Sequence, residues 1–148
     1  MNSTDPISSM FAQIQNGQKA KLFSVLVPVS KSKLAILDAF YFHGYIQGYR
    51  LISAQNTMHV RSRLHNTNNY IFCKGQIEIF LKYSNVTGVI DKIVRISSPG
   101  QRVFYCNKKK YNLEHEFKTS FFSTSFGILP GYMCNSRNLG GEFLCVIY

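Results

Sequence analysis

The strictest pattern in this chain is the alternation of apolar and polar side chains over residues 76–83. The apolar positions are Ile77, Ile79, Leu81 and Tyr83, each separated from the next by one residue. A period of two residues predicts a β-strand that buries one side and exposes the other. One strand cannot bury a side alone, and residues 45–52 alternate in a similar way. We therefore predict that 45–52 and 76–83 pair as antiparallel strands.

Two helices are predicted ahead of these strands. Asp5-Pro6 has the form of an N-cap followed by a first helical residue, because the carboxylate can accept backbone N–H bonds and proline lacks one. Apolar residues then recur at spacings of three and four, which predicts a helix over 6–16 with Gly17 at its end. A second helix is predicted over 31–43, ahead of Gly44.

The remaining patterns predict two small units. Further strands are expected at 23–27, 89–96, 102–105 and 143–147, and one or two helical turns at 113–118. Residues 53–75 are polar and rich in Asn, so we expect a long connection there. The fold class is predicted to be α+β. An N-terminal α/β unit is expected over 1–84, and a mostly β unit with one or two short helices over 85–148.

The charge of the chain favours a polyanionic partner. Seventeen Lys and Arg residues stand against seven Asp and Glu, which gives a formal charge of +10. No apolar run reaches the roughly 18 residues of a membrane-spanning helix, and no basic amphipathic helix is present, so we expect no membrane partner. Lys31 and Lys33 lie in the first turn of a predicted helix, where two cations are unfavourable unless they face an anion. Nucleic acid is therefore the expected partner.

Catalytic and cofactor chemistry find little support. The four Cys and four His residues show none of the spacings of a zinc site. The glycines do not form a nucleotide-binding motif, and no Ser stands in a catalytic motif with His and an acid. We expect no enzyme activity, metal, cofactor or small-molecule substrate. The alternative is an enzyme with a nucleophile among Cys73, Cys106, Cys134 and Cys145.

One short segment suits RNA. Ser123, Thr124 and Ser125 offer three hydroxyls, each both donor and acceptor, and Gly127 would let backbone amides approach a phosphate. Such groups can bind bases, 2′-hydroxyls and phosphates in the shallow minor groove of RNA. The alternative is an ordinary Ser-rich turn.

Four segments together resemble the bacterial-type family of small-subunit ribosomal protein eight. They are Asp5-Pro6-Ile7 with Gln15-Asn16-Gly17, the stretch Arg95 to Arg102, the stretch Ser123 to Gly127, and Leu139-Gly140-Gly141-Glu142. The resemblance covers nearly the whole chain except 53–75. It implies an N-terminal α-β-α-β-β unit and a mostly β C-terminal unit, which together bind a helical junction in the central domain of small-subunit rRNA.

The resemblance also implies a set of RNA-binding residues and partners. In the C-terminal unit the residues are Ser98, Pro99, Gly100, Arg102, Tyr105, Ser123, Thr124, Ser125, Gly127, Gly140, Gly141 and Glu142. In the N-terminal unit they are Asp5, Asn16, Lys31 and Lys33. Neighbouring small-subunit proteins are the other expected partners. The alternative function is a translational regulator that binds messenger RNA through the same surface.

The sequence departs from the family at informative places. Phe126 stands where a polar or basic residue is usual, so a phosphate contact is expected to be lost, or the ring stacks on a base or a protein. Many Asn, Tyr, Phe and Ile residues suggest an AT-rich organellar genome, and we expect the mitochondrial matrix, with the plastid as alternative. The family motif starts at Asp5, so we expect synthesis inside the organelle or removal of a presequence.

Overall fold

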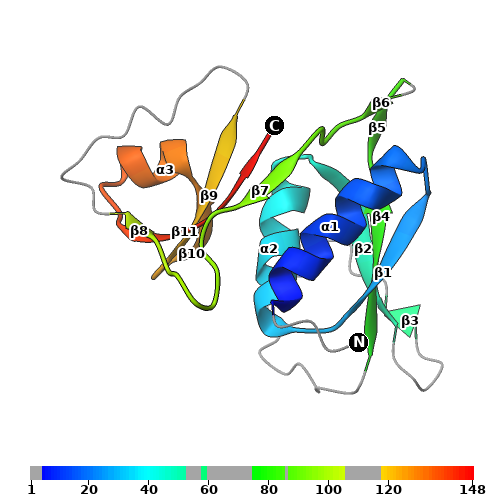
Figure 1. Ribbon diagram of the computed structural model, residues 1–148, viewed down its shortest axis with the longest axis horizontal. Helices are drawn as coiled ribbons and strands as arrows, with labels where there is room; N and C mark the ends of the chain where they lie inside the picture. The colour runs from blue at the N-terminus through cyan, green and yellow to red at the C-terminus, as the bar shows by residue number, and fades with distance from the viewer. Residues whose placement is uncertain (1–4, 53–57, 60–74, 86, 106–117) are drawn as a thin grey trace. The chain divides into compact units, whose positions relative to one another are not determined.

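The computed structural model describes residues 5–52, 58–59, 75–85, 87–105 and 118–148 (Figure 1). They contain helices and antiparallel sheets, so the predicted α+β class is confirmed. The chain divides into two compact units, one of Met1–Gln15 with Ile90–Tyr148 and one of Asn16–Val89. The domain limits of 1–84 and 85–148 stay a prediction, and the helical turns expected at 113–118 lie outside the described residues.

The unit Asn16–Val89 is built on a four-stranded antiparallel sheet in the order β1-β4-β2-β3. Its strands are β1 (Ser24–Pro28), β2 (Ile46–Ile52), β3 (Met58–His59) and β4 (Gln76–Leu81). The predicted pairing of 45–52 with 76–83 is confirmed, since Tyr49 lies opposite Ile79. Ile77, Ile79 and Leu81 are buried, as the alternation predicts. Helix α2 (Lys31–Phe42) lies against β2 and buries one stripe.

After β4 the chain turns through a short hairpin rather than continuing the strand. It consists of β5 (Tyr83–Ser84) and β6 (Thr87–Gly88), which pair with each other. Asn85 between them has φ +57, a conformation that Asn tolerates better than most residues. The predicted boundary between residues 84 and 85 falls within this hairpin.

Helix α1 (Pro6–Lys19) is longer than predicted, because Gly17 does not end it. A Cβ on Gly17 would lie 2.6 Å from Cγ1 of Val25, so the glycine is required for close packing within the helix. The end comes at Lys21, whose φ is +55. The amides of Lys21 and Leu22 donate to the carbonyls of Gln18 and Gly17, which is the Schellman pattern with lysine in the left-handed position.

The C-terminal segment forms a second antiparallel sheet in the order β10-β9-β11-β7, with β8 also paired to β11. Its elements are β7 (Ile93–Arg95), β8 (Phe104–Tyr105), β9 (Thr119–Thr124), β10 (Gly127–Pro130), α3 (Gly131–Ser136) and β11 (Gly141–Ile147). The strand expected at 143–147 is found within β11, but of the strand expected at 102–105 only 104–105 pair. The prediction of a strand over 89–96 was wrong in length, since only 93–95 pair. Helix α3, which covers the buried Phe122, was not predicted.

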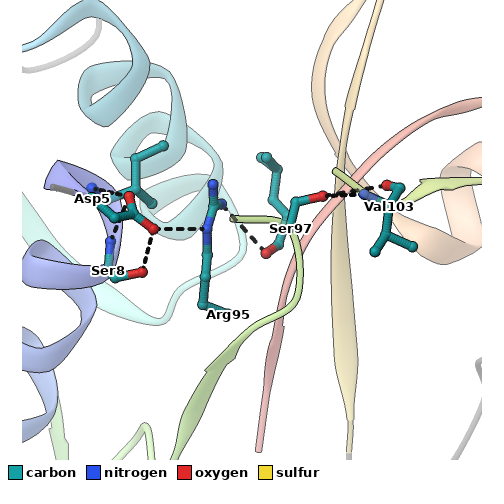
Figure 2. A network of polar contacts seen from close by, with 7 residues as sticks. Asp5, Ser8, Arg95, Ser97 and Val103 are labelled. Atoms are coloured by element: carbon teal, nitrogen blue, oxygen red, sulfur yellow. Dashed lines mark hydrogen bonds and ion pairs between the residues drawn. The ribbon is translucent and has the colours of Figure 1, made fainter. Parts of the chain in front are cut away.

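A polar network joins the start of α1 to the second sheet (Figure 2). Asp5 caps the helix, since its Oδ1 accepts the N–H groups of Ile7 at 3.0 Å and Ser8 at 3.3 Å. Its Oδ2 accepts the Ser8 hydroxyl and lies 3.7 Å from Nε of Arg95. Arg95 also donates to the carbonyl of Leu144 at 3.4 Å. Partial burial opposes ionisation of Asp5, but the hydrogen bonds from Ser8 and Ile7 and the charge of Arg95 leave its pKa below the ordinary value.

This network predicts a pH-dependent contribution to stability. Asp5→Asn keeps a capping oxygen and removes the charge, so we expect a loss of about 0.5–1 kcal/mol in unfolding free energy near pH 7. Because the folded pKa is lowered, the stabilisation is present above the unfolded value near 4 and disappears as pH falls through the folded pKa. Urea unfolding of both proteins at neutral pH and at about pH 2 measures this. A difference that persists at low pH would contradict an electrostatic origin.

Candidate RNA interface

The segment Ser123 to Gly127 is the tip of the β9–β10 hairpin. Thr124 and Gly127 form its last pair, with Ser125 and Phe126 between them. The Thr124 hydroxyl accepts the N–H of Phe126 at 3.2 Å and donates to the carbonyl of Gly127 at 2.8 Å. Gly127 has φ +104, which explains the glycine by backbone conformation. One of the three predicted hydroxyls thus holds the turn itself.

The two turn residues point to solvent. Ser125 is exposed, and Phe126 is 71% exposed, among the highest values for the large apolar residues that the structure describes. The hydrogen bonds of Thr124 fix the backbone beneath both residues. The tip therefore presents one hydroxyl and one aromatic ring on a preorganised turn.

A row of side chains continues from this hairpin across the sheet. Ser123 lies opposite Glu142 of β11, which in turn lies opposite Phe104 of β8. Residues directly opposite in antiparallel strands share one face, so these three side chains lie on the same side. Phe104 is 70% exposed, and Nη1 of Arg102 lies 3.6 Å from a Glu142 oxygen with most of the Arg102 side chain in solvent. The other face carries the buried Phe122 and the partly buried Phe143, whose rings stack at 4.6 Å.

Gly140 and Gly141 bring β11 close to its neighbours. A Cβ on Gly141 would lie 2.3 Å from the carbonyl oxygen of Ser123, and one on Gly140 would lie 3.0 Å from that of Tyr105. No side chain fits at Gly141 without movement of the backbone. The two glycines therefore place the hairpin, Glu142 and Arg102 beside one another. Whether they also touch RNA stays a prediction.

The turn at Ser98-Pro99-Gly100 is closed and anchored. Ser98 and Gln101 exchange two backbone hydrogen bonds of 2.9 and 3.1 Å, while Pro99 and Gly100 are exposed. Beneath them the fully buried Ser97 accepts the N–H of Val103 at 2.9 Å and donates to its carbonyl at 3.3 Å (Figure 2). Both sides of this loop also bond to the backbone of Phe143 in β11, so the turn flanks the same strand.

Ser97 was missed by the sequence reasoning as a positioning residue. The only available signal was a serine directly before the Ser-Pro-Gly turn. Its hydroxyl holds both backbone groups of Val103, so the exposed turn keeps its place beside β11.

Other predicted site residues have roles inside the fold. Tyr105 is 8% exposed, and its hydroxyl donates to Oδ1 of Asn135 at 2.8 Å. Lys33 is 3% exposed and donates to the carbonyl of Pro28 at 3.2 Å, and burial lowers the pKa of its ammonium. Asp5 is the helix cap. Asn16 and Lys31 are exposed and belong to the other compact unit.

The described residues also bear on the alternative chemistries. Burial raises the pKa of the Cys145 thiol to about 12, although Arg95 opposes the shift, and burial also raises that of Cys134. A thiolate nucleophile is thus disfavoured at both positions, while Cys73 and Cys106 lie outside the described residues. In the described ranges no group of three or more His, Cys, Asp or Glu could hold a metal. None of the helices in those ranges is long and apolar enough to span a membrane.

Comparison with known proteins assigns the family. The model of the family described as ribosomal protein S8 matches residues 5–148. Similar proteins include small ribosomal subunit protein uS8 of Rhizobium etli (strain CIAT 652), 30% identical, and those of Allorhizobium ampelinum and Bartonella bacilliformis, each 32% identical. Each alignment spans 148 residues and all of both chains. With its hairpin, paired glycines and anchored turn, this chain belongs to the ribosomal protein S8 family.

Proposed function

We propose that this chain is a structural component of the small ribosomal subunit and binds a helical junction in the central domain of small-subunit rRNA. The observation that carries the proposal is the cluster around the start of β11. There the exposed hairpin tip, the turn 98–100 and the exposed guanidinium of Arg102 flank one strand. The formal charge of +10 supplies the electrostatic attraction.

The cluster suits an RNA helix in two ways. Arg102 can neutralise phosphate, which adds affinity without reading sequence. The hydroxyls of Ser123 and Ser125 can donate to and accept from 2′-hydroxyls and base edges in a shallow minor groove. Lys33 and Tyr105 contribute through the fold, because both side chains are buried and bonded within it.

For location we propose the mitochondrial ribosome, with the plastid ribosome as the alternative. Support comes from composition alone, including 12 Phe and 9 Tyr in 148 residues. Fractionation of cells that express a tagged chain tests this, and the tag should sediment with mitochondrial small subunits. Recovery with plastid or cytosolic subunits would contradict it.

A second candidate is binding of a messenger RNA that imitates the rRNA site, through the same hairpin surface. It is favoured by the preorganised tip, which would accept any RNA of matching shape. Overproduction should then lower ribosome occupancy on one transcript, and an unchanged ribosome profile would remove this role.

The proposed binding to rRNA should depend on the salt concentration. The purified chain should bind a transcript of the central domain, and affinity should fall on the order of a thousandfold between about 50 and 200 mM salt if some six phosphates are contacted. Filter binding or fluorescence anisotropy measures this. Salt-insensitive binding, or equal affinity for an unrelated duplex, would contradict a specific electrostatic interface.

Two hydroxyls of the hairpin should have different roles, that of Ser125 in RNA binding and that of Thr124 in stability. Ser125→Ala should weaken RNA binding by about 1–3 kcal/mol with unchanged stability, because the exposed hydroxyl is buried only in the complex. Thr124→Val should lower the unfolding free energy by about 1 kcal/mol, because it removes both turn bonds.

A matched control is Ser84→Ala, which removes an exposed hydroxyl from the β5–β6 hairpin of the other unit. It should leave both RNA affinity and stability unchanged. If Ser125→Ala binds as tightly as the wild type, the tip does not contact RNA through this hydroxyl.

A further inference from the structure

We propose that the outer face of the four-stranded sheet is a docking surface for a neighbouring protein that presents an uncharged, apolar side. This face is separate from the hairpin surface proposed for RNA. Its rows are fixed by register, since Phe80 lies between Ser24 and Gly48, and Glu78 between Leu26 and Arg50. The alternate residues Val27, Ile77 and Ile79 are buried on the opposite side. The outer face thus comprises Ser24, Leu26, Pro28, Gly48, Arg50, Ile52, Gln76, Glu78 and Phe80.

Large apolar side chains gather on this face and at its edge. Leu26 is 51% exposed, and Phe23, which directly precedes β1, is 70% exposed. The Phe23 ring packs on that of Phe80, with centroids 5.5 Å apart. Gly48, opposite Phe80, brings no side chain, and nothing lies within 4 Å of where its Cβ would be. Because Gly48 has no side chain, a side chain of a partner protein can reach the surface beside Phe80. Adjacent exposed aromatic and aliphatic residues are typical of a surface that becomes covered.

The polar groups at the centre of the face are already satisfied. Glu78 accepts the Ser24 hydroxyl at 2.8 Å and forms an ion pair with Arg50, whose guanidinium lies 5.6 Å above the Phe80 ring. The Ser24 hydrogen bond, against partial burial and with the help of Arg50, keeps the pKa of Glu78 low. Covering a pair that is formed beforehand avoids leaving either charge alone in an apolar interface.

The charges argue for protein rather than RNA on this face. A phosphate near Arg50 would have to compete with Glu78, whose carboxylate would also repel it. Lys82 directly follows the end of β4, and its ammonium donates to the carbonyl of Gly44 at 2.9 Å. Aromatic residues and Arg are enriched in protein interfaces, and Lys is depleted there. A second copy is disfavoured because each chain carries a formal charge of +10.

The experiment places benzoylphenylalanine, a photoreactive amino acid, at position 26 of the full chain in living cells. Irradiation should give one discrete adduct with a polypeptide that is resistant to ribonuclease and sensitive to protease. Phe23→Ser should lower its yield by about tenfold, because it removes a neighbouring apolar anchor. The same probe at Ala35, an exposed position on α2, is the control and should not capture that polypeptide.

Three results would overturn the proposal. A ribonuclease-sensitive adduct would mean that RNA covers the face, and an adduct of two copies would mean self-association. Absence of any adduct, together with normal particle incorporation of Leu26→Gln, would mean that nothing docks there.

The outcome is separable from that of the proposed function. Purified Leu26→Gln should fold and bind the rRNA transcript within about twofold of the wild type, because position 26 lies in the other compact unit from the hairpin. Failure of the wild type to bind rRNA would contradict the proposed function, whereas the adduct would still support the docking surface.

Discussion

The close approach of β11 to β9 at Gly141 is the constraint on which the candidate interface depends. The backbone of Gly141 lies so near the carbonyl of Ser123 that a Cβ would come within 2.3 Å of that oxygen. This contact sets the row in which Ser123, Glu142 and Phe104 follow one another across three strands. The loop that contains the turn 98–100 forms backbone hydrogen bonds with Phe143 of the same strand. Gly141 therefore contributes, together with Gly140 and Ser97, to where the groups proposed for RNA lie.

The two sheets are both antiparallel, but their exposed faces carry different kinds of side chains. The C-terminal sheet buries aromatic rings on one face and directs a hydroxyl, a carboxylate and Phe104 to the other, beside an exposed guanidinium. The outer face of the N-terminal sheet neutralises its own charges through Ser24, Glu78 and Arg50. It leaves Leu26 and Phe23 exposed around them. Both arginines have a carboxylate partner, but most of the Arg102 side chain is in solvent, whereas the Arg50–Glu78 pair is partly buried. The exposed guanidinium suits phosphate, and the partly buried pair suits a dry protein contact.

Sequence periodicity predicted what depends on local pattern and missed what depends on packing. The pairing of β2 with β4 followed from alternation, because a one-residue slip would expose every buried side chain. Gly17 was mistaken for a helix end, since its close packing is against Val25 of β1 and Leu81 of β4, which the pattern within the helix does not show. Helix α3 has six residues, too few for an apolar period to appear. In the site, Ser125 and Arg102 are exposed and their contacts with RNA stay predictions, whereas the buried Lys33 and the turn role of Thr124 are visible only in three dimensions.

The contact of the hairpin tip with rRNA can be measured where it would occur, in the assembled small subunit. Phe126 is 71% exposed at that tip, so benzoylphenylalanine can replace it with little change of shape. Irradiation of subunits that contain this variant should produce an adduct with small-subunit rRNA, and reverse transcription should stop within the central domain. An adduct formed only with protein, or stops confined to another rRNA domain, would contradict the proposed interface.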